Sequence, residues 1–452
     1  MGTDAIASRG TPSTPEFVEG EVDLIPVASR LPVHTAIQKW FPILVKFTSV
    51  QVIVQALGFA AGILIVRGLP KREYAFYTIG NTMLATILLL ADSGISSALT
   101  AIGGRVWQDE HRLGSLLTTA LQLRRQLAIL TIFAVVPVLV WLLRQNGANP
   151  LVTVGLVLAV LAGSGLELIT RIYAVVLRLR SEIRQIQNQA LMAALVKLAA
   201  VGIALFIFFN AVVAIVTVVL GYAVQFWMLR RWVSREIDTT APGDPAMRSE
   251  ILTVLRRQAP HSVYYCLQGQ ITVWLISVFG NSESVANVGA LGRLVVVFSL
   301  LSTVMIEVVL PAFARIQSIN QLRRRYFHII AGYLAISVLS VGVVAMFPGQ
   351  ILSVLGKQYS DLRSDGILMA ACAVVSTIAG LLWAINSSRA WIVSPAVLIP
   401  CTIAVQAVLA SVLDLSTVRG VLLLTMYSWV PSIILSLWLA MKKMWAPSAI
   451  AV

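Results

Sequence analysis

Six charged side chains stand well inside long apolar runs of this sequence, and they are the residues best placed to do chemistry. Three are cations and three are carboxylates: Arg171, Lys197, Arg293, Asp92, Glu167 and Glu307. A charge at the middle of a lipid bilayer costs about 2.5–3.5 kcal/mol on insertion scales, so a charge that persists there usually faces a partner or a water-filled cavity. We expect the cations to contact an anionic substrate and the carboxylates to serve in coupling or pairing.

Arg293 is the strongest candidate for substrate contact. It lies about ten residues into its apolar run, roughly 15 Å at the helical rise per residue, and therefore near the midplane of a bilayer. A guanidinium keeps its charge when desolvated and binds phosphate oxygens in pairs. A structural ion pair is the alternative. Lys197 stands about one third of the way into its run, where it could line a cavity or extend to the membrane surface.

The carboxylates each have two interpretations. Glu167 and Arg171 are four residues apart on one helix face, so they can neutralise each other and fix packing, or a substrate phosphate can compete with Glu167 for Arg171. Asp92 and Glu307 lie toward the ends of their runs. There a carboxylate can couple transport to a proton or Na⁺, or pair with a nearby cation.

Metal and catalytic chemistry find no support in the sequence. The histidines are scattered without ligand spacing: His34, His111, His261 and His328. The cysteines fall in apolar stretches without a CxxC pair: Cys266, Cys372 and Cys401. We expect no cofactor, no metal and no catalytic residue.

The elements that position these charges are membrane helices. Apolar residues make up 58% of the chain and charged residues 12%, against about 45–50% and 25% in soluble domains. Runs long enough to cross a bilayer recur, and they predict about twelve spans near 44–66, 74–100, 127–143, 151–177, 190–209, 211–229, 259–280, 284–313, 328–347, 366–385, 396–415 and 420–440. Only Asn210 interrupts the run at 190–229, and we divide the two spans there.

Loop charge gives the helices an orientation. The formal charge of +14 comes from basic residues between the apolar runs, which argues against nucleic acid as a partner. If residues 1–43 are a disordered cytoplasmic tail and interfacial lead-in, the connections on that side hold 23 of the 34 Lys and Arg and those on the other side hold seven. This imbalance predicts that both termini, including the tail at 441–452, are cytoplasmic.

Residues 230–258 contain a polar stretch that we interpret as a cytoplasmic linker between two six-helix lobes, 44–229 and 259–440. Glu73 and Glu283 each open the second span of their half, and Arg105 and Arg315 each close it, at a common offset of 210 residues. Because six is an even number, the two lobes would have parallel orientation.

The stretch from Lys46 to Arg105 resembles the polysaccharide exporters of the multidrug/oligosaccharidyl-lipid/polysaccharide superfamily. The motifs are Arg67-Gly68-Leu69-Pro70, Glu73-Tyr74 with Phe76-Tyr77, and Asp92-Ser93-Gly94, with Ala75 where the family usually has glycine. In the second half, Leu310-Pro311-Ala312-Phe313-Ala314-Arg315 is similar to another family motif, and the likeness extends to about residue 327.

The resemblance implies a MATE-like all-α membrane fold and a Wzx-type flippase of the bacterial inner membrane. Such a protein moves polyprenyl-pyrophosphate-linked oligosaccharide across the membrane for surface polysaccharide biosynthesis, with membrane lipid and other polysaccharide-assembly proteins as partners. Two alternatives stay open: a cation-coupled drug or metabolite antiporter of the same superfamily, and a membrane glycan polymerase or ligase. With Lys46 at the edge of the first span, the spans hold four cations against three carboxylates, which disfavours an exporter of cationic drugs. The largest outer segment, 348–365, contains no histidine, so it gives no support to an enzyme.

Overall fold

The computed structural model describes the backbone of residues 33–180, 182–238, 241–295, 298, 310, 313, 316, 318–389 and 391–445, and the side chains of these residues except 33–49, 183, 257 and 258. The first 32 residues of the predicted tail, and Glu307 and Arg315, lie outside this part of the chain. The described residues before Val50 and those from Val50 onward belong to separate units, and the candidate membrane spans of the described residues all lie in the second unit.

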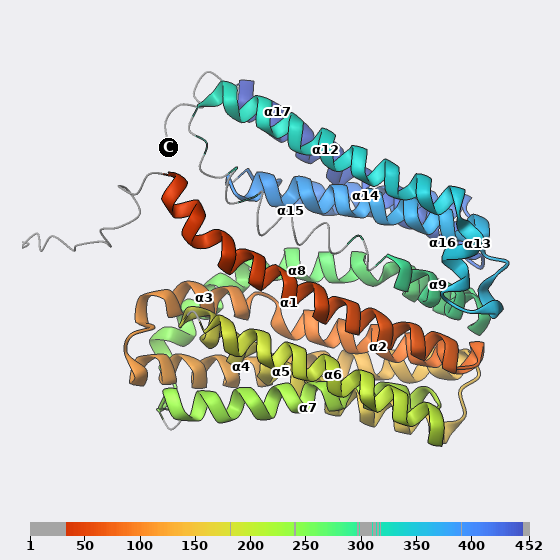
Figure 1. Cartoon of the computed structure of the whole chain (residues 1–452), viewed down its shortest axis with the longest axis horizontal. Helices are drawn as coiled ribbons and strands as arrows, with labels where there is room; N and C mark the ends of the chain where they lie inside the picture. The colour runs from red at the N-terminus through yellow and green to blue at the C-terminus, as the bar shows by residue number, and fades with distance from the viewer. Residues whose placement is uncertain are drawn as a thin grey trace, which may run out of the picture. The chain divides into compact units, whose positions relative to one another are not determined.

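The described residues of the first half form seven helices (Figure 1): α1 Val33–Gly68, α2 Lys71–Asp92, α3 Ile95–Val106, α4 Glu110–Gln145, α5 Pro150–Leu179, α6 Ile183–Ile207 and α7 Ala211–Glu236. The second half adds α8 Pro245–Phe279, α9 Ser282–Leu294, α12 Ile319–Met346, α13 Pro348–Ser353, η2 Lys357–Tyr359, α14 Arg363–Ser387, α15 Pro395–Val412, α16 Val418–Ser428 and α17 Val430–Trp445. Within the described residues, ten segments are long and apolar enough to cross a membrane. The all-helical membrane fold predicted from the sequence is confirmed.

Local sequence signals explain where the helices begin. Asn210 divides the 190–229 run as predicted: its side chain accepts a hydrogen bond from the backbone N–H of Val213 at 2.9 Å and so caps α7. Asp244 caps α8 in the same way, accepting from the N–H of Ala246. Within the predicted linker at 230–258, helix extends from both sides, and only 237–244 lies between α7 and α8.

The span predicted at 74–100 is two helices instead of one. α2 ends at Asp92, because Ser93 and Gly94 adopt positive φ angles of 37° and 105°, and α3 begins at Ile95. Glycine tolerates this left-handed backbone without steric cost, so Gly94 permits the break. The hydropathy of the run conceals the break, because both helices are apolar.

α2 is the most buried of the membrane-spanning helices in the described part of the chain. It contacts α4, α5 and α7 of its own half and α8 and α9 of the other half. Its side chains at four-residue spacing include three buried threonines, Thr78, Thr82 and Thr86. The hydroxyls of Thr78 and Thr86 donate to the carbonyls of Tyr74 and Thr82 within the same helix, at 2.8 and 2.9 Å.

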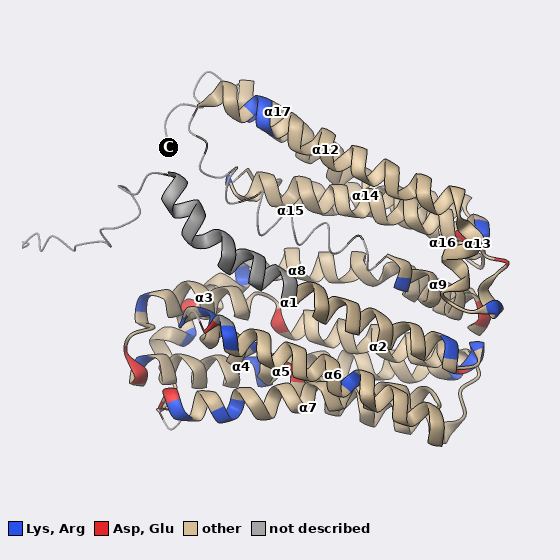
Figure 2. Ribbon diagram, viewed as in Figure 1, with Lys and Arg blue, Asp and Glu red and all other residues tan. Residues whose placement is uncertain are grey.

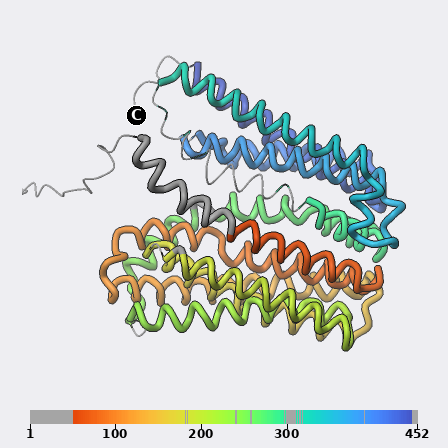
Figure 3. Tube along the Cα trace, in the orientation of Figure 1, coloured from red at the N-terminus to blue at the C-terminus, as the bar shows by residue number. Residues whose placement is uncertain are grey.

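Peripheral helices expose apolar side chains, as expected for contact with lipid. Phe206 of α6 is 92% exposed and Met346 of α12 is 75% exposed, and many large apolar side chains elsewhere are similarly open. Soluble monomers rarely expose so much contiguous apolar surface. Figure 3 shows successive long helices running back and forth along a common direction, which suits repeated crossing of a bilayer.

Charged residues gather at the two ends of the helices (Figure 2). We use the term basic end for the end at which α3, α7 and α17 finish and α4, α8 and α12 begin (Figure 1). The cations near these helix ends in the sequence are Arg105, Arg112, Arg230, Arg231, Arg235, Arg248, Arg323, Arg324, Arg325, Lys442 and Lys443. At the opposite end, where α1 and α4 finish and α2 begins, the cations include Arg67, Lys71, Arg72 and Arg144. The alternation of strongly and weakly basic connections seen in the sequence therefore corresponds to two ends of the helices.

Candidate functional site

Arg293 lies in the last turn of α9 and contacts two tyrosines of α2. Its Nε donates to the hydroxyl of Tyr74 at 3.3 Å, and one Nη donates to the hydroxyl of Tyr77 at 3.1 Å. The guanidinium also lies over the Tyr77 ring, 5.6 Å from its centre. Residues of the two halves of the sequence thus join in one polar site.

The two tyrosines are themselves held in place. Their rings stack with centroids 5.7 Å apart, because positions 74 and 77 share a face of α2. The Tyr74 hydroxyl donates to the carbonyl of Gly289 on α9 at 3.1 Å, so it accepts from one residue of α9 and donates to another. This hydroxyl therefore connects the backbone of α9 to the arginine that α9 carries.

Glycines allow the helices to approach at this point. A Cβ added at Gly289 would lie 2.3 Å from Oγ1 of Thr78, a distance too short for any side chain. A Cβ at Gly62 of α1 would lie 3.5 Å from Nη1 of Arg293, so the guanidinium is close to the backbone of α1. Helices α1, α2 and α9 thus meet around Arg293.

The site is cationic. In the described part of the chain no carboxylate pairs with Arg293, whose hydrogen-bond partners are the hydroxyls of two tyrosines. Lys197, on α6, is near enough to interact electrostatically with both Tyr77 and Arg293. The base of the Lys197 side chain packs against Gly221 of α7. A Cβ added at Gly221 would lie 3.7 Å from the Cβ of Lys197. Two of the three predicted cations therefore share one region.

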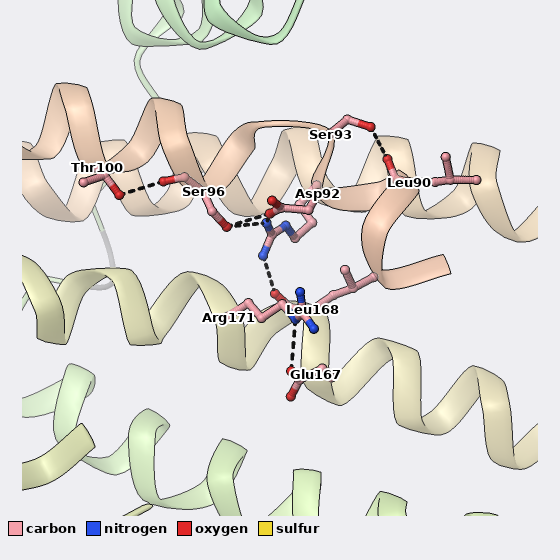
Figure 4. Close-up of polar contacts among 9 residues, drawn as sticks. Leu90, Asp92, Ser93, Ser96, Thr100, Glu167, Leu168 and Arg171 are labelled. Carbon is pink, nitrogen blue, oxygen red and sulfur yellow. Dashed lines mark hydrogen bonds and ion pairs between the residues drawn. The ribbon is translucent and has the colours of Figure 1, made fainter. Parts of the chain in front are cut away.

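A second polar cluster joins α2, α3, α4 and α5 toward the basic end (Figure 4). Asp92 forms an ion pair with Arg124 of α4, whose side chain is only 3% exposed. Ser96 donates to Asp92 at 2.6 Å and accepts from Arg124 at 3.1 Å. Arg124 also donates to the carbonyl of Leu168 at 2.8 Å. Asp92 therefore lies in an ion pair with a neighbouring cation in this structure.

Glu167 and Arg171 form the predicted pair one turn apart on α5, with Arg171 Nε 3.0 Å from Oε1 of Glu167 (Figure 4). The second carboxylate oxygen of Glu167 is buried and has no hydrogen-bond partner in the described part of the chain. Arg124 is close enough to interact electrostatically with both residues. Arg171 thus belongs to this second cluster, apart from the contacts made by Arg293.

Three residues of these sites were missed in the sequence. Arg124 stands beside Arg125 in a basic stretch that hydropathy assigns to a loop, yet it is buried while Arg125 is exposed. Its spacing from Leu113, Leu117 and Ala120 places it on the buried face of α4, and this periodicity was the available signal. Tyr74 and Tyr77 were recognised only as residues of a family motif. Their three-residue spacing also indicates that they lie on the same face of one helix.

At the opposite end, the two halves make direct contacts. Lys71 of α2 pairs with Glu283 of α9 at 2.5 Å. Arg67 of α1 donates to the carbonyls of Ser353 and Val354 at 2.7 and 2.9 Å. Burial raises the pKa of the nearby Tyr359 phenol, which therefore stays neutral beneath Lys71, 5.8 Å from its ring centre. Contacts between the halves thus include both an ion pair and backbone hydrogen bonds.

Glu73 and Glu283, related by the 210-residue offset, both lie in the first turn of their helices but have different partners. Glu73 accepts a hydrogen bond from the backbone N–H of Ala211 at 2.9 Å and so adds to the cap of α7. Glu283 pairs with Lys71 instead. The two carboxylates thus share a position at the start of a helix and differ in their partners.

Comparison with solved structures identifies the fold. An inward-facing structure of a multidrug resistance MATE family transporter of the MOP superfamily is similar with a TM-score of 0.63 and 18% identity, over 87% of this chain and 98% of that chain. An outward-facing structure of such a transporter gives a TM-score of 0.60 and 19% identity, over 88% and 92%. The chain therefore has the MATE-like fold expected from its sequence, and it is a multi-pass membrane protein.

A MOP superfamily transporter from Pyrococcus furiosus, described as having a binding pocket of reverse polarity that suggests a different function, is also similar. Its TM-score is 0.57 and its identity 18%, over 88% of this chain and 93% of that chain. No protein-family profile and no curated protein matches the sequence. At these identities the likeness concerns the fold alone.

Proposed function

We propose that this protein is a transporter that moves a lipid-linked, anionic substrate across the membrane by alternating access, without catalysis. The single observation that carries the proposal is Arg293, a cation between α1, α2 and α9 that is held by two tyrosine hydroxyls and, among the described residues, by no carboxylate. A partly buried cation without a described carboxylate partner favours an anionic ligand, because the ligand supplies the missing charge.

The substrate class in this proposal is a polyprenyl-pyrophosphate-linked oligosaccharide. Its diphosphate would engage Arg293, with Lys197 adding a second positive charge, and its prenyl chain would remain in lipid. The lobes 44–229 and 259–440 would rock against each other, and the contact between Lys71 of α2 and Glu283 of α9 would open and close as they do. The setting is the bacterial inner membrane with both termini cytoplasmic, and other polysaccharide-assembly proteins would supply and consume the substrate.

The second candidate function is a cation-coupled antiporter for drugs or metabolites, which the names of the similar structures favour. A cationic drug requires a free carboxylate. Of the predicted carboxylates that the structure describes, Asp92 pairs with Arg124 and Glu167 pairs with Arg171, so each already has a cation. This arrangement supports the anionic substrate over the cationic drug. Asp92 or Glu167 could bind a proton or Na⁺ for coupling only if its ion pair with arginine opens.

The test is transfer of a fluorescent polyprenyl-pyrophosphate oligosaccharide between the leaflets of proteoliposomes. We expect transfer by the wild type and at least about a tenfold loss with Arg293→Gln, because hydrogen bonds to charged groups are worth about 1.5–3 kcal/mol. The matched control is Arg125→Gln, which removes an exposed arginine of α4. Absence of transfer by wild-type protein that still exports cationic dyes would overturn the proposal.

A further inference from the structure

A pocket at the basic end lies along α12 and plays no part in the contacts of Arg293. Its volume is about 730 Å³, within the usual range of about 300–1,000 Å³ for small-molecule sites. Seven described residues line it: Phe313, Ile316, Gln321, Arg324, Arg325, His328 and Ile329. The described lining thus contains two arginines and a histidine but no carboxylate.

Helix geometry turns the polar residues of α12 to one side. Gln321, Arg324, Arg325 and His328 are spaced by three and four residues, so they share a face. The opposite face buries Leu322, Tyr326 and Tyr333 in a cluster with Phe313. Packing of this buried face therefore fixes the direction in which the cations point.

The cations of the pocket have no anionic partner in the described part of the chain. Arg324 and Arg325 form none of its ion pairs. Arg323, in contrast, is committed to the end of α17: it donates to the carbonyl of Met444 at 2.6 Å and lies 4.7 Å from the Trp445 ring centre. Two guanidiniums are thus available to an external anion.

Beyond the pocket, the same face of α12 continues as small and apolar residues. Ala331, Gly332 and Ala335 follow Arg324, Arg325 and His328 at seven-residue spacing, and all three are exposed. A Cβ at Gly332 would meet nothing within 4 Å, and Leu339 further along is 69% exposed. A cationic pocket at a helix end therefore leads into a shallow apolar track at membrane depth.

We propose that this pocket binds the headgroup of an anionic phospholipid, whose acyl chains lie along Ala331, Gly332, Ala335 and Leu339. The phosphate accepts hydrogen bonds from Arg324 and Arg325, since guanidinium forks match phosphate oxygens. Basic pockets between helices at a membrane surface recognise acidic headgroups in this way. A zwitterionic headgroup also carries an ammonium group, and the described lining has no carboxylate to pair with it. The site therefore selects anionic lipids.

The experiment titrates purified full-length protein in detergent with phosphatidylglycerol or phosphatidylcholine and counts bound lipids by native mass spectrometry. Each basic residue near a membrane surface contributes roughly fivefold in affinity for anionic lipid, so Arg324→Gln/Arg325→Gln should weaken phosphatidylglycerol binding by about 25-fold. The matched control is Arg230→Gln/Arg231→Gln, which removes an adjacent, exposed pair at the same end and should change binding by less than about threefold.

A second variant tests the track separately from the charge. Gly332→Leu fits in open space, so it should leave the fold intact and reduce phosphatidylglycerol binding while both arginines remain. Equal losses in the two double variants, or no preference of the wild type for phosphatidylglycerol over phosphatidylcholine, would overturn the site. Displacement of the lipid by equimolar sodium pyrophosphate, or by much less polyprenyl diphosphate, would overturn the phospholipid as its occupant.

Discussion

The hydroxyl of Tyr77 accepts a hydrogen bond from Arg293 at 3.1 Å although the two residues are 216 positions apart in the sequence. The bond joins α2 of the first half to α9 of the second. It also orients a cation that no described carboxylate neutralises. The second half therefore supplies the cation, Arg293, and the first half supplies a hydroxyl that orients it.

Tyr77→Phe should raise the apparent KM for transport of the lipid-linked substrate by about threefold to tenfold, because the guanidinium loses one of the two hydroxyls that orient it. The protein should fold normally, since the ring remains. Transfer between the leaflets of proteoliposomes over a range of substrate concentrations measures the effect. Tyr427→Phe, which alters a half-exposed tyrosine of α16, serves as the control. An unchanged KM in Tyr77→Phe would show that the hydroxyl does not position Arg293 for binding.

Arg124→Gln should destabilise the protein by about 3–5 kcal/mol, because it removes one partner of a buried ion pair and leaves Asp92 without its cation. Thermal unfolding in detergent measures the loss. Arg125→Gln, the neighbouring exposed arginine, should stay within about 0.5 kcal/mol of wild type. A double variant, Asp92→Asn/Arg124→Gln, should recover part of the loss, and a double variant less stable than Arg124→Gln alone would contradict the pairing.

Cross-linking at the opposite end should stop transport. Lys71 and Glu283 are in contact through the tips of their side chains, so Lys71→Cys/Glu283→Cys in a chain carrying Cys401→Ser should be joined by a short bismaleimide with a reducible disulfide spacer, which holds α2 against α9. We expect transfer between leaflets to fall at least tenfold on cross-linking and to return on reduction of the spacer. Full activity of the cross-linked protein would mean that this contact never opens. The single variant Lys71→Cys, treated with the same reagent, controls for modification elsewhere.

Gly289→Ala should destabilise the contact between α2 and α9 by about 1–3 kcal/mol, the usual cost of overpacking. The added methyl would lie 2.3 Å from Thr78 Oγ1. Thr78→Ala should restore part of the stability in the double variant. Gly332→Ala is the matched control, since it adds the same methyl where nothing lies within 4 Å. If the two alanine variants unfold at the same temperature, α2 and α9 do not approach as described.

The sequence predicted the membrane helices well because apolar run length is a strong and local signal. It located Asn210 as a division between spans and placed Glu167 beside Arg171, since a helix fixes four-residue neighbours. It missed the break at Gly94, where both flanks are apolar and only backbone geometry differs. Local sequence signals therefore suffice to predict where most of the membrane helices lie.

Long-range partners could not be read in the same way. Whether Asp92 pairs with Arg124 depends on how α4 packs against the junction of α2 and α3. Whether Arg293 meets Tyr74 and Tyr77 depends on close approach between helices far apart in the chain, which Gly289 permits. Glycines at such positions were not distinguishable, in one sequence, from glycines such as Gly332 that face open space.

The threonines on the face of α2 bear on the order of folding. α2 is synthesised well before α8 and α9, which later cover it. Because the hydroxyls of Thr78 and Thr86 donate to carbonyls of their own helix, neither needs a partner from the second half to satisfy its hydrogen bond. The helix can therefore enter the bilayer with this face toward lipid, without an unsatisfied hydroxyl at those two positions, until the second half is inserted.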